Sequence, residues 1–261
     1  MDRRPTVLIP IAPGTNRNEE LALAFRAAGA DTNQVPLAAL RRGEVKLVDH
    51  QILGLPGGFS YGDALGAGRL LGLDLTSWFA EQLVEARARQ MPIIGICNGF
   101  QALVRAGLLP GDVPVTGRRG QGVTANLAEN ENGRFECRWV ELLPGATWSP
   151  WTAGLDRPIR CPIAHGEGRF VTSDLSAVEA ADRVAFRYGI AGAAAGGAYP
   201  DNPNGSAGDI AGVVDETGLI LGLMPHPEDH VFERQDPHRR RALGGRCLPL
   251  FEAGVAAVAA G

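Results

Sequence analysis

The sequence PIIGICNGFQALVRAG (residues 92–107) joins a short, unbroken apolar run to residues with helical spacing. An apolar run of this length without polar alternation predicts a strand buried on both faces, here 92–97. A helix is predicted to follow directly, over 98–106. A strand that passes straight into a helix is the repeating unit of parallel sheets, so this stretch indicates the class of fold.

The same alternation of strand and helix continues through the first half of the chain. Further strands are predicted at 6–12, 32–37 and 50–58, and further helices from Asn18, as N-cap, to Gly29 and over 76–90. The strands are apolar throughout, which favours a sheet covered by helices on both faces. The predicted fold is therefore α/β, with a mostly parallel central sheet flanked by helices.

The second half of the chain has a different pattern. Strands with more alternation, typical of antiparallel pairing, are predicted at 133–143, 158–165 and 182–189, with a hairpin over 208–226 that turns at Asp215–Gly218. A helical segment is predicted over 237–261, interrupted near Gly244–Gly245. No internal repeat or interdomain linker is visible. We therefore expect one domain over 1–261, in which an additional antiparallel region extends the parallel sheet.

Composition narrows the class of protein. The chain has 261 residues, 45% hydrophobic and 21% charged, with a net charge of -4, which is typical of a globular protein and does not suggest a nucleic-acid partner. No run approaches the roughly 18 apolar residues of a spanning helix. The four cysteines have no C-x-x-C spacing, which argues against a zinc site or a dithiol motif. We expect a cytoplasmic protein with free thiols, and no metal or cofactor bound by this chain.

Cys97 lies between Gly95 and Gly99 where the strand passes into the helix. The G-x-C-x-G pattern is the thiol version of the nucleophile elbow, a tight turn that exposes its central side chain at the end of the sheet. A helix N-terminus stabilises the reactive thiolate, and the N–H of Asn98 is placed to receive an oxyanion. The alternative interpretation is a buried structural cysteine, since free cysteines are often buried.

A nucleophilic thiol requires a base, and His226 is the best candidate. It follows an apolar strand and lies between Pro225 and Pro227. In an extended segment residues i and i+2 point to the same side, so Glu228 is predicted to orient the imidazole. Cys97, His226 and Glu228 would then form a triad, although a loop histidine beside a solvated glutamate is the alternative.

Two glycines follow the strand at 50–58. The N–H of Gly58, next to Gly57, is a candidate second donor for an oxyanion. The alternative is an ordinary glycine-rich turn between a strand and a helix. The stretch lacks the lysine of a phosphate-binding loop, so it does not indicate a nucleotide site.

Three of these stretches together resemble the class I (triad) glutamine amidotransferases, which have a flavodoxin-like fold: LPGGFSYGD (55–63), GICNGFQ (95–101) and MPHPE (224–228). Longer blocks extend the likeness to the glutaminase subunits of phosphoribosylformylglycinamidine synthase: NENGRFECRWV (130–140), PIAHGEGRF (162–170), NPNGS (202–206) and GLMPHPED (222–229). The resemblance runs in order from about residue 6 to residue 232. It departs from the family at Asp229, where members commonly have Arg.

The resemblance implies a reaction. Cys97 would attack the side-chain amide of glutamine to form a γ-glutamyl thioester, with His226 as acid and base, oriented by Glu228. The N–H groups of Gly58 and Asn98 would hold the oxyanion. Further substrate-binding candidates are Phe59, Gln101 and His165, although a histidine in the sequence position of His165 is more often a turn histidine.

The resemblance also implies partners. A large synthetase subunit, which would bind ATP and Mg²⁺, would use the ammonia to convert formylglycinamide ribonucleotide to the amidine. A small third subunit is also expected. Two alternatives stay open: a glutaminase that serves another ATP-dependent synthetase, and a non-enzymatic binding module with the same fold.

Overall fold

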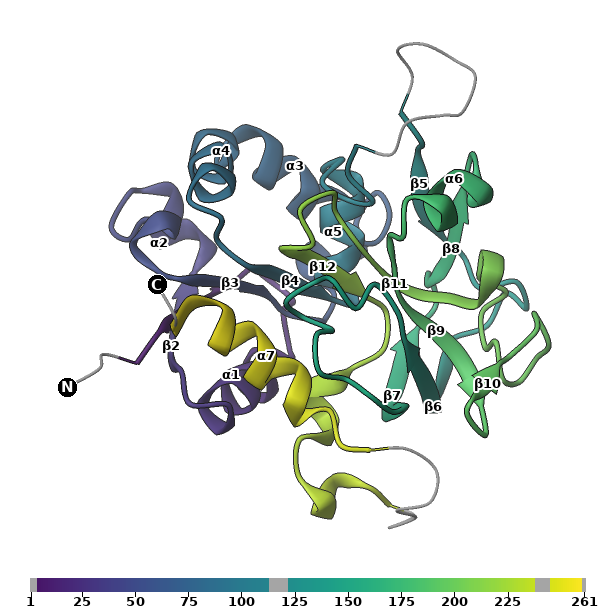
Figure 1. The fold of residues 1–261 in the computed structure, drawn as a ribbon. Coiled ribbons are helices and arrows are strands. Elements are labelled where there is room, and N and C mark those ends of the chain that lie inside the picture. The colour runs from purple at the N-terminus through teal and green to yellow at the C-terminus, as the bar shows by residue number, and fades with distance from the viewer. Residues whose placement is uncertain (1–3, 113–121, 238–244, 260–261) are drawn as a thin grey trace.

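The computed structural model describes residues 4–112, 122–237 and 245–259, and Figure 1 shows them arranged around one twisted sheet. The ten strands described for this sheet lie in the order β2 (Asp31–Pro36), β1 (Thr6–Ile11), β3 (Ile52–Leu55), β4 (Ile93–Ile96), β12 (Ile220–Leu223), β11 (Ile210–Val214), β9 (Val184–Ile190), β6 (Glu136–Pro144) and β7 (Ile159–His165), with β10 (Ala193–Ala194) paired to β9. The strands from β2 to β12 are parallel, and those from β12 to β7 are antiparallel. The α/β prediction, with its additional antiparallel region, is confirmed.

Helices cover the parallel half on both faces (Figure 1). One face carries α1 (Asn18–Ala27) and α7 (Leu248–Ala259), and the other carries α2 (Leu37–Arg41), α3 (Arg69–Ser77), α4 (Ala80–Ala88) and α5 (Asn98–Arg105). Beside the antiparallel half, α6 (Leu175–Ala180) lies near a small sheet of β5 (Ala125–Ala128) and β8 (Arg169–Thr172). This covering explains why β3 and β4 are buried along their whole length.

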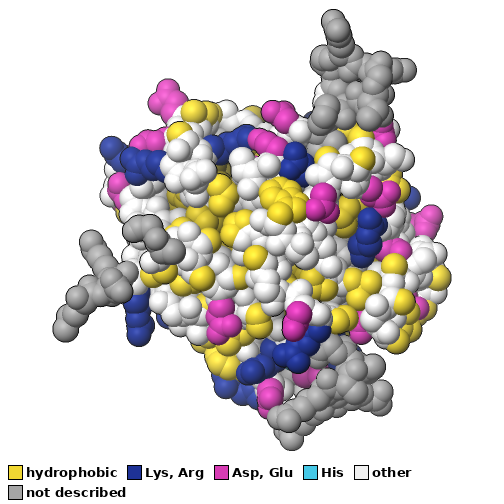
Figure 2. All heavy atoms as spheres, viewed as in Figure 1, with side chains coloured by type: hydrophobic (Ala, Val, Ile, Leu, Met, Phe, Trp, Pro, Cys, Tyr) yellow, Lys and Arg dark blue, Asp and Glu magenta, His cyan; other side chains and the backbone are white. Residues whose placement is uncertain are grey.

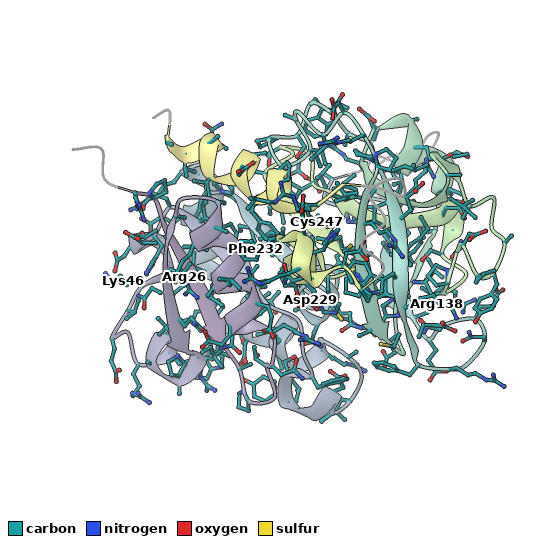
Figure 3. All side chains as sticks on the ribbon, turned by 90° about the horizontal axis from the view of Figure 1, so that it is seen from below. Arg26, Lys46, Arg138, Asp229, Phe232 and Cys247 are labelled. Carbon is teal, nitrogen blue, oxygen red and sulfur yellow. The ribbon has the colours of Figure 1, made fainter. Side chains whose placement is uncertain are left out.

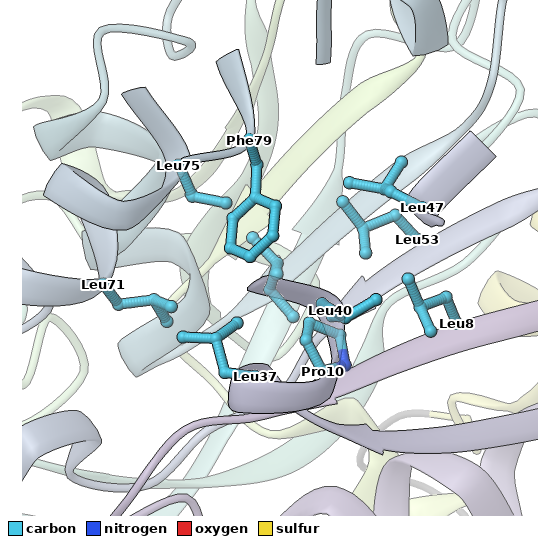
Figure 4. A pocket seen from close by; sticks show the side chains of 10 residues that line it. Leu8, Pro10, Leu37, Leu40, Leu47, Leu53, Leu71, Leu75 and Phe79 are labelled. Atoms are coloured by element: carbon cyan, nitrogen blue, oxygen red, sulfur yellow. The ribbon is translucent and has the colours of Figure 1, made fainter. Parts of the chain in front are cut away.

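Two local predictions were wrong. The helix expected over 76–90 is divided, because α3 ends at Ser77 and α4 begins at Ala80. Between them Phe79 turns inward and packs with leucines of α2, α3 and the sheet in the apolar pocket of Figure 4. The N-cap of α1 is Arg17, not Asn18, and it makes no side-chain cap. The sequence pattern also missed β5, β8 and α6, which are short.

The C-terminal helix begins after the predicted interruption near Gly244–Gly245. Of the segment 237–261, residues 248–259 form α7, and 238–244 lie outside the described residues. Among the residues that the structure does describe, no helix is both long enough and apolar enough to cross a membrane. On the face drawn in Figure 2, Lys and Arg side chains are interspersed with Asp and Glu and form no continuous basic strip.

The strand β12 connects the two halves of the sheet. It is parallel to β4, with Leu223 opposite Ile96, and it forms the predicted hairpin with β11. The antiparallel half then curls back, so that its last strand, β7, reaches the ends of β4 and β12: His226 N–H donates to the Pro162 carbonyl at 2.8 Å. Three segments far apart in sequence therefore meet at one end of the parallel strands.

Candidate active site

The backbone at Cys97 is strained. Its φ and ψ are 51° and −105°, a backbone conformation that residues other than glycine rarely adopt, as is typical of a nucleophile elbow. A Cβ on Gly99 would lie 2.2 Å from the Leu55 carbonyl oxygen, and one on Gly95 would lie 2.7 Å from the Gly99 oxygen. Both flanking glycines are thus required for the turn. Strain of this kind costs about 1–3 kcal/mol and persists where the surroundings enforce it.

The two other triad candidates lie beyond β12. His226 Nδ1 donates to Glu228 Oε1 at 2.7 Å, and both side chains are buried. The segment is not extended as the sequence pattern suggested, because Pro227–His230 form a 3₁₀ turn, η4. A single turn brings i and i+2 close enough for the contact, so the expected pairing is present for a different reason.

The proton affinity of His226 is perturbed by its surroundings. Burial lowers the pKa of the imidazole, but the Glu228 carboxylate and the Cys97 sulfur together outweigh burial and raise it well above its ordinary value. Cys97 Sγ and the His226 backbone both contact β7, at Ala164 and Pro162, which brings the thiol and the imidazole to the same end of the sheet. In this conformation the thiol points to the Ala164 carbonyl, 3.8 Å away, and His226 Nε2 has no hydrogen-bond partner. The nitrogen that a base would use is free.

The two predicted oxyanion donors lie at this end of the sheet. Gly58 has a φ of 133° and forms a β-bridge with Thr15. That bridge uses the N–H groups of Phe59 and Asn16 and leaves the Gly58 N–H outside it. Asn98 is the first residue of α5, where a helix has no internal partner for the N–H.

Next to the thiol is a pocket of about 220 Å³. Its lining includes Cys97, Gly58, Phe59, Gln101 and His165, with Asp63, Ala67, Phe135 and residues 164, 166 and 167. Cys97 is only 5% exposed, but it opens into this pocket and is not enclosed in the core. The predicted binding residues are thus brought together with the thiol.

The His165 ring is held so that its Nε2 carries no proton and has no hydrogen-bond partner. Its Nδ1 lies 3.1 Å from Asn130 Oδ1, while the amide group of Asn130 donates to two carbonyls, which assigns the proton to Nδ1. Burial and the neighbouring His226 lower the pKa of His165 to about 3. The ring is consequently neutral, and its Nε2 is an unpartnered acceptor.

Gln101 and Asn98 use their side chains to build the wall of the pocket. Gln101 Nε2 donates to the Glu167 carbonyl at 2.6 Å, and its Oε1 accepts from Asn98 Nδ2 at 3.0 Å. Asn98 also binds the loop after β3, accepting from Ser60 N–H and donating to Asp63. These contacts leave the backbone N–H of Asn98, and not its amide group, as the free donor.

Comparison with known proteins shows the family to which the chain belongs. A profile of the CobB/CobQ-like glutamine amidotransferase domain matches residues 4–256. The phosphoribosylformylglycinamidine synthase subunit PurQ of Treponema denticola is 42% identical, over 97% of this chain and 98% of its own. The chain belongs to the PurQ family of glutamine amidotransferases.

A further relative and two solved structures support the same family or fold. The PurQ subunit of Dehalococcoides mccartyi is 42% identical over 88% of this chain and 87% of its own. A chain in the structure of PurLQS from Thermotoga maritima has a TM-score of 0.74 and 32% identity, covering 98% of this chain and 99% of that one. A GMP synthase component from Thermoplasma acidophilum, with a TM-score of 0.57 and 15% identity over 99% of this chain and 96% of its own, shares the fold.

Several site residues of this PurQ family member were not predicted from sequence. Asn130 positions His165, and Arg17, from the start of α1, lies within 3.9 Å of Asp229. Glu167 and Phe135 line the pocket. None follows a motif with an intrinsic chemical signal, because their roles arise only when distant segments pack together. In the described ranges, no group of three or more His, Cys, Asp or Glu is arranged to hold a metal ion.

Proposed function

We propose that this chain hydrolyses glutamine through Cys97, His226 and Glu228, with a γ-glutamyl thioester as intermediate. The observation that carries the proposal is the buried 2.7 Å contact of His226 Nδ1 with Glu228, which leaves Nε2 free beside a strained thiol. A base oriented by a carboxylate beside a nucleophile is the arrangement that acyl transfer requires.

The steps follow from these positions. Cys97 Sγ attacks the amide carbon of glutamine, and the thiol proton passes to His226 Nε2. The oxyanion lies toward the N–H groups of Gly58 and Asn98. His226 then gives the proton to nitrogen, the C–N bond breaks and ammonia leaves. A water molecule, deprotonated by His226, attacks the thioester and releases glutamate with the thiol restored.

The substrate lies in the pocket beside Cys97. His165 Nε2, a neutral acceptor, accepts a hydrogen bond from a nitrogen of glutamine. Phe59, which is 45% exposed, lines the pocket near its opening, and Gln101 keeps the wall in place. The pocket binds glutamine without a metal ion or cofactor.

The ammonia serves a partner. PurQ is named as a subunit of phosphoribosylformylglycinamidine synthase in the relatives above, and this chain is the glutaminase component of that enzyme in purine biosynthesis. A large synthetase subunit uses ATP and Mg²⁺ to convert formylglycinamide ribonucleotide to the amidine, and a small third subunit completes the complex. A cytoplasmic setting, which keeps Cys97 reduced, is part of the proposal.

Glutamine hydrolysis, measured with and without the synthetase and its nucleotide substrate, tests the proposal. We expect hydrolysis to depend on Cys97, and a glutamine-analogue electrophile to label Cys97 stoichiometrically. Hydrolysis without labelling would remove Cys97 from the mechanism. Activation only by a different ATP-dependent synthetase would favour the first alternative, and neither labelling nor hydrolysis in the complex would favour a binding module.

A further inference from the structure

Arg17 extends from the start of α1 toward the catalytic segment. Its Nη1 lies 3.2 Å from Glu20 and 3.9 Å from Asp229 Oδ1, on the turn that follows His226. A Cβ built on Gly57 would lie 2.7 Å from His226 Cε1 and 3.5 Å from Arg17 Cγ, so one glycine separates the arginine stem from the imidazole. In Figure 3, Asp229 lies where the segment after β12 passes beside α1.

This segment places two carboxylates in succession. Glu228 is fully buried, and its Oε2 has no hydrogen-bond partner. Asp229 is adjacent and largely buried; burial, followed by the Glu228 charge, raises the pKa of Asp229 to about 6. His226 and Arg17 oppose this rise. Two neighbouring buried carboxylates repel, so their arrangement depends on nearby positive charge.

Arg17 is matched to that need. Burial alone would lower the pKa of its guanidinium, but Asp229, Glu20 and Glu228 outweigh burial and raise it. The guanidinium thus interacts favourably with the catalytic carboxylate as well as with its neighbour. Because Arg17 is the N-cap residue of α1 without a side-chain capping bond, its side chain is available to reach η4.

We infer that Arg17 is a positioning residue of the active site: its positive charge offsets the Glu228–Asp229 pair and thereby sets the proton affinity of His226. The inference rests on the proposed function of this triad. It predicts the direction as well as the size of the shift in each pH profile. Removing a cation stabilises every proton-bound state nearby, whereas removing the Asp229 anion does the opposite.

The other charges around the pair have defined places. Glu20, on the same helix as Arg17, competes for the guanidinium at 3.2 Å. Cys161, on β7, lies beneath the segment, and its thiol is kept protonated because burial raises its pKa. His165, at the end of β7 and near His226, is neutral because its pKa is lowered to about 3. His230, in the same turn, contacts the Arg160 carbonyl. Glu20, Cys161 and His165 cannot replace Arg17, since none of them is positively charged.

The test is the pH dependence of Cys97 alkylation by a glutamine-analogue electrophile, and of kcat/KM for glutamine in the assembled complex. In Arg17→Met, we expect the acidic limb of both profiles to move to higher pH by about half to one unit, allowing for the partial exposure of the guanidinium. In Asp229→Asn, the limb should move to lower pH. Arg17→Met combined with Asp229→Asn should return near the wild-type midpoint, and Arg17→Lys should retain it.

Arg26→Met is the matched control, because Arg26 lies on the same helix, is exposed and bonds only Thr32 among the contacts described. It removes the same charge from the chain away from the site, and its profile should match wild type. An Arg17→Met profile that superimposes on that of the wild type would overturn the inference, as would equal shifts in Arg17→Met and Arg26→Met. Glutamine hydrolysis and Cys97 labelling in the wild type test the proposed function separately, so failure of the Arg17 inference is distinguishable from failure of the proposed function.

Discussion

Glu228→Gln separates the charge of the third triad residue from its shape. Glutamine has nearly the same size as glutamate, and its amide oxygen is able to accept from His226 Nδ1 as Oε1 does at 2.7 Å. The variant therefore keeps the hydrogen bond and removes only the negative charge. We expect turnover to fall while the fold stays intact.

The size of the effect follows from the contact. A hydrogen bond to a charged group contributes about 1.5–3 kcal/mol, roughly twice a neutral one, so replacing the charged bond by a neutral one loses about 0.75–1.5 kcal/mol of transition-state stabilisation, or about threefold to tenfold in rate. The pH profile gives an independent sign. Because Glu228 raises the pKa of His226 against the effect of burial, its neutralisation lowers that pKa, and the acidic limb moves to lower pH.

The assay is glutamine hydrolysis in the complex across pH 5.5 to 9, with thermal unfolding measured in parallel. Glu19→Gln, an exposed carboxylate on α1, is the matched control and should behave as wild type. A Glu228→Gln rate within about twofold of wild type, with an unshifted acidic limb, would show that the carboxylate does not act on the imidazole.

Three further outcomes are expected. Cys97→Ala should abolish glutamine-dependent synthesis in the complex but preserve synthesis from ammonium salts; loss of both would contradict the division of labour between subunits. Gly99→Ala should lower the free energy of unfolding by more than about 3 kcal/mol, because its Cβ would lie 2.2 Å from the Leu55 carbonyl oxygen. The melting temperature should therefore fall strongly, and an unchanged melting temperature would contradict the packing. The His165 ring should stay neutral from pH 8 down to about 4, as followed by NMR of the imidazole, since its pKa is lowered to about 3; titration near pH 6.5 would contradict its burial.

The parallel half of the fold was predictable because each strand there has a recognisable local sequence pattern. The run before Cys97 is apolar on both faces, and its glycines mark the turn that the structure places there. The hairpin at Asp215–Gly218 was equally visible. Phe79 shows the limit: helical spacing continues through it, and only packing against leucines of other elements breaks the helix.

The candidate site was predictable where a reactive side chain lies directly after the end of a predicted strand. Cys97, His226 and Glu228 were identified in that way, and the structure brings His226 and Glu228 into contact beside the thiol. Asn130 and Arg17 could not be found, because the sequence contains nothing about the approach of β7 or α1 to the site. The assignment of 1–261 to one domain stays a prediction, as do the catalytic roles.

The return of β7 to the thiol makes the active centre depend on contacts between segments that lie far apart in the chain. Pro162 and Ala164, which contact the His226 backbone and the Cys97 sulfur, belong to the outermost strand of the sheet, more than sixty positions from either side chain in the chain. Such distant pairings form only after long loops have closed. A chain that had assembled its parallel core alone would hold the thiol without its surroundings, so the reactivity of one sulfur atom reports completion of the entire sheet.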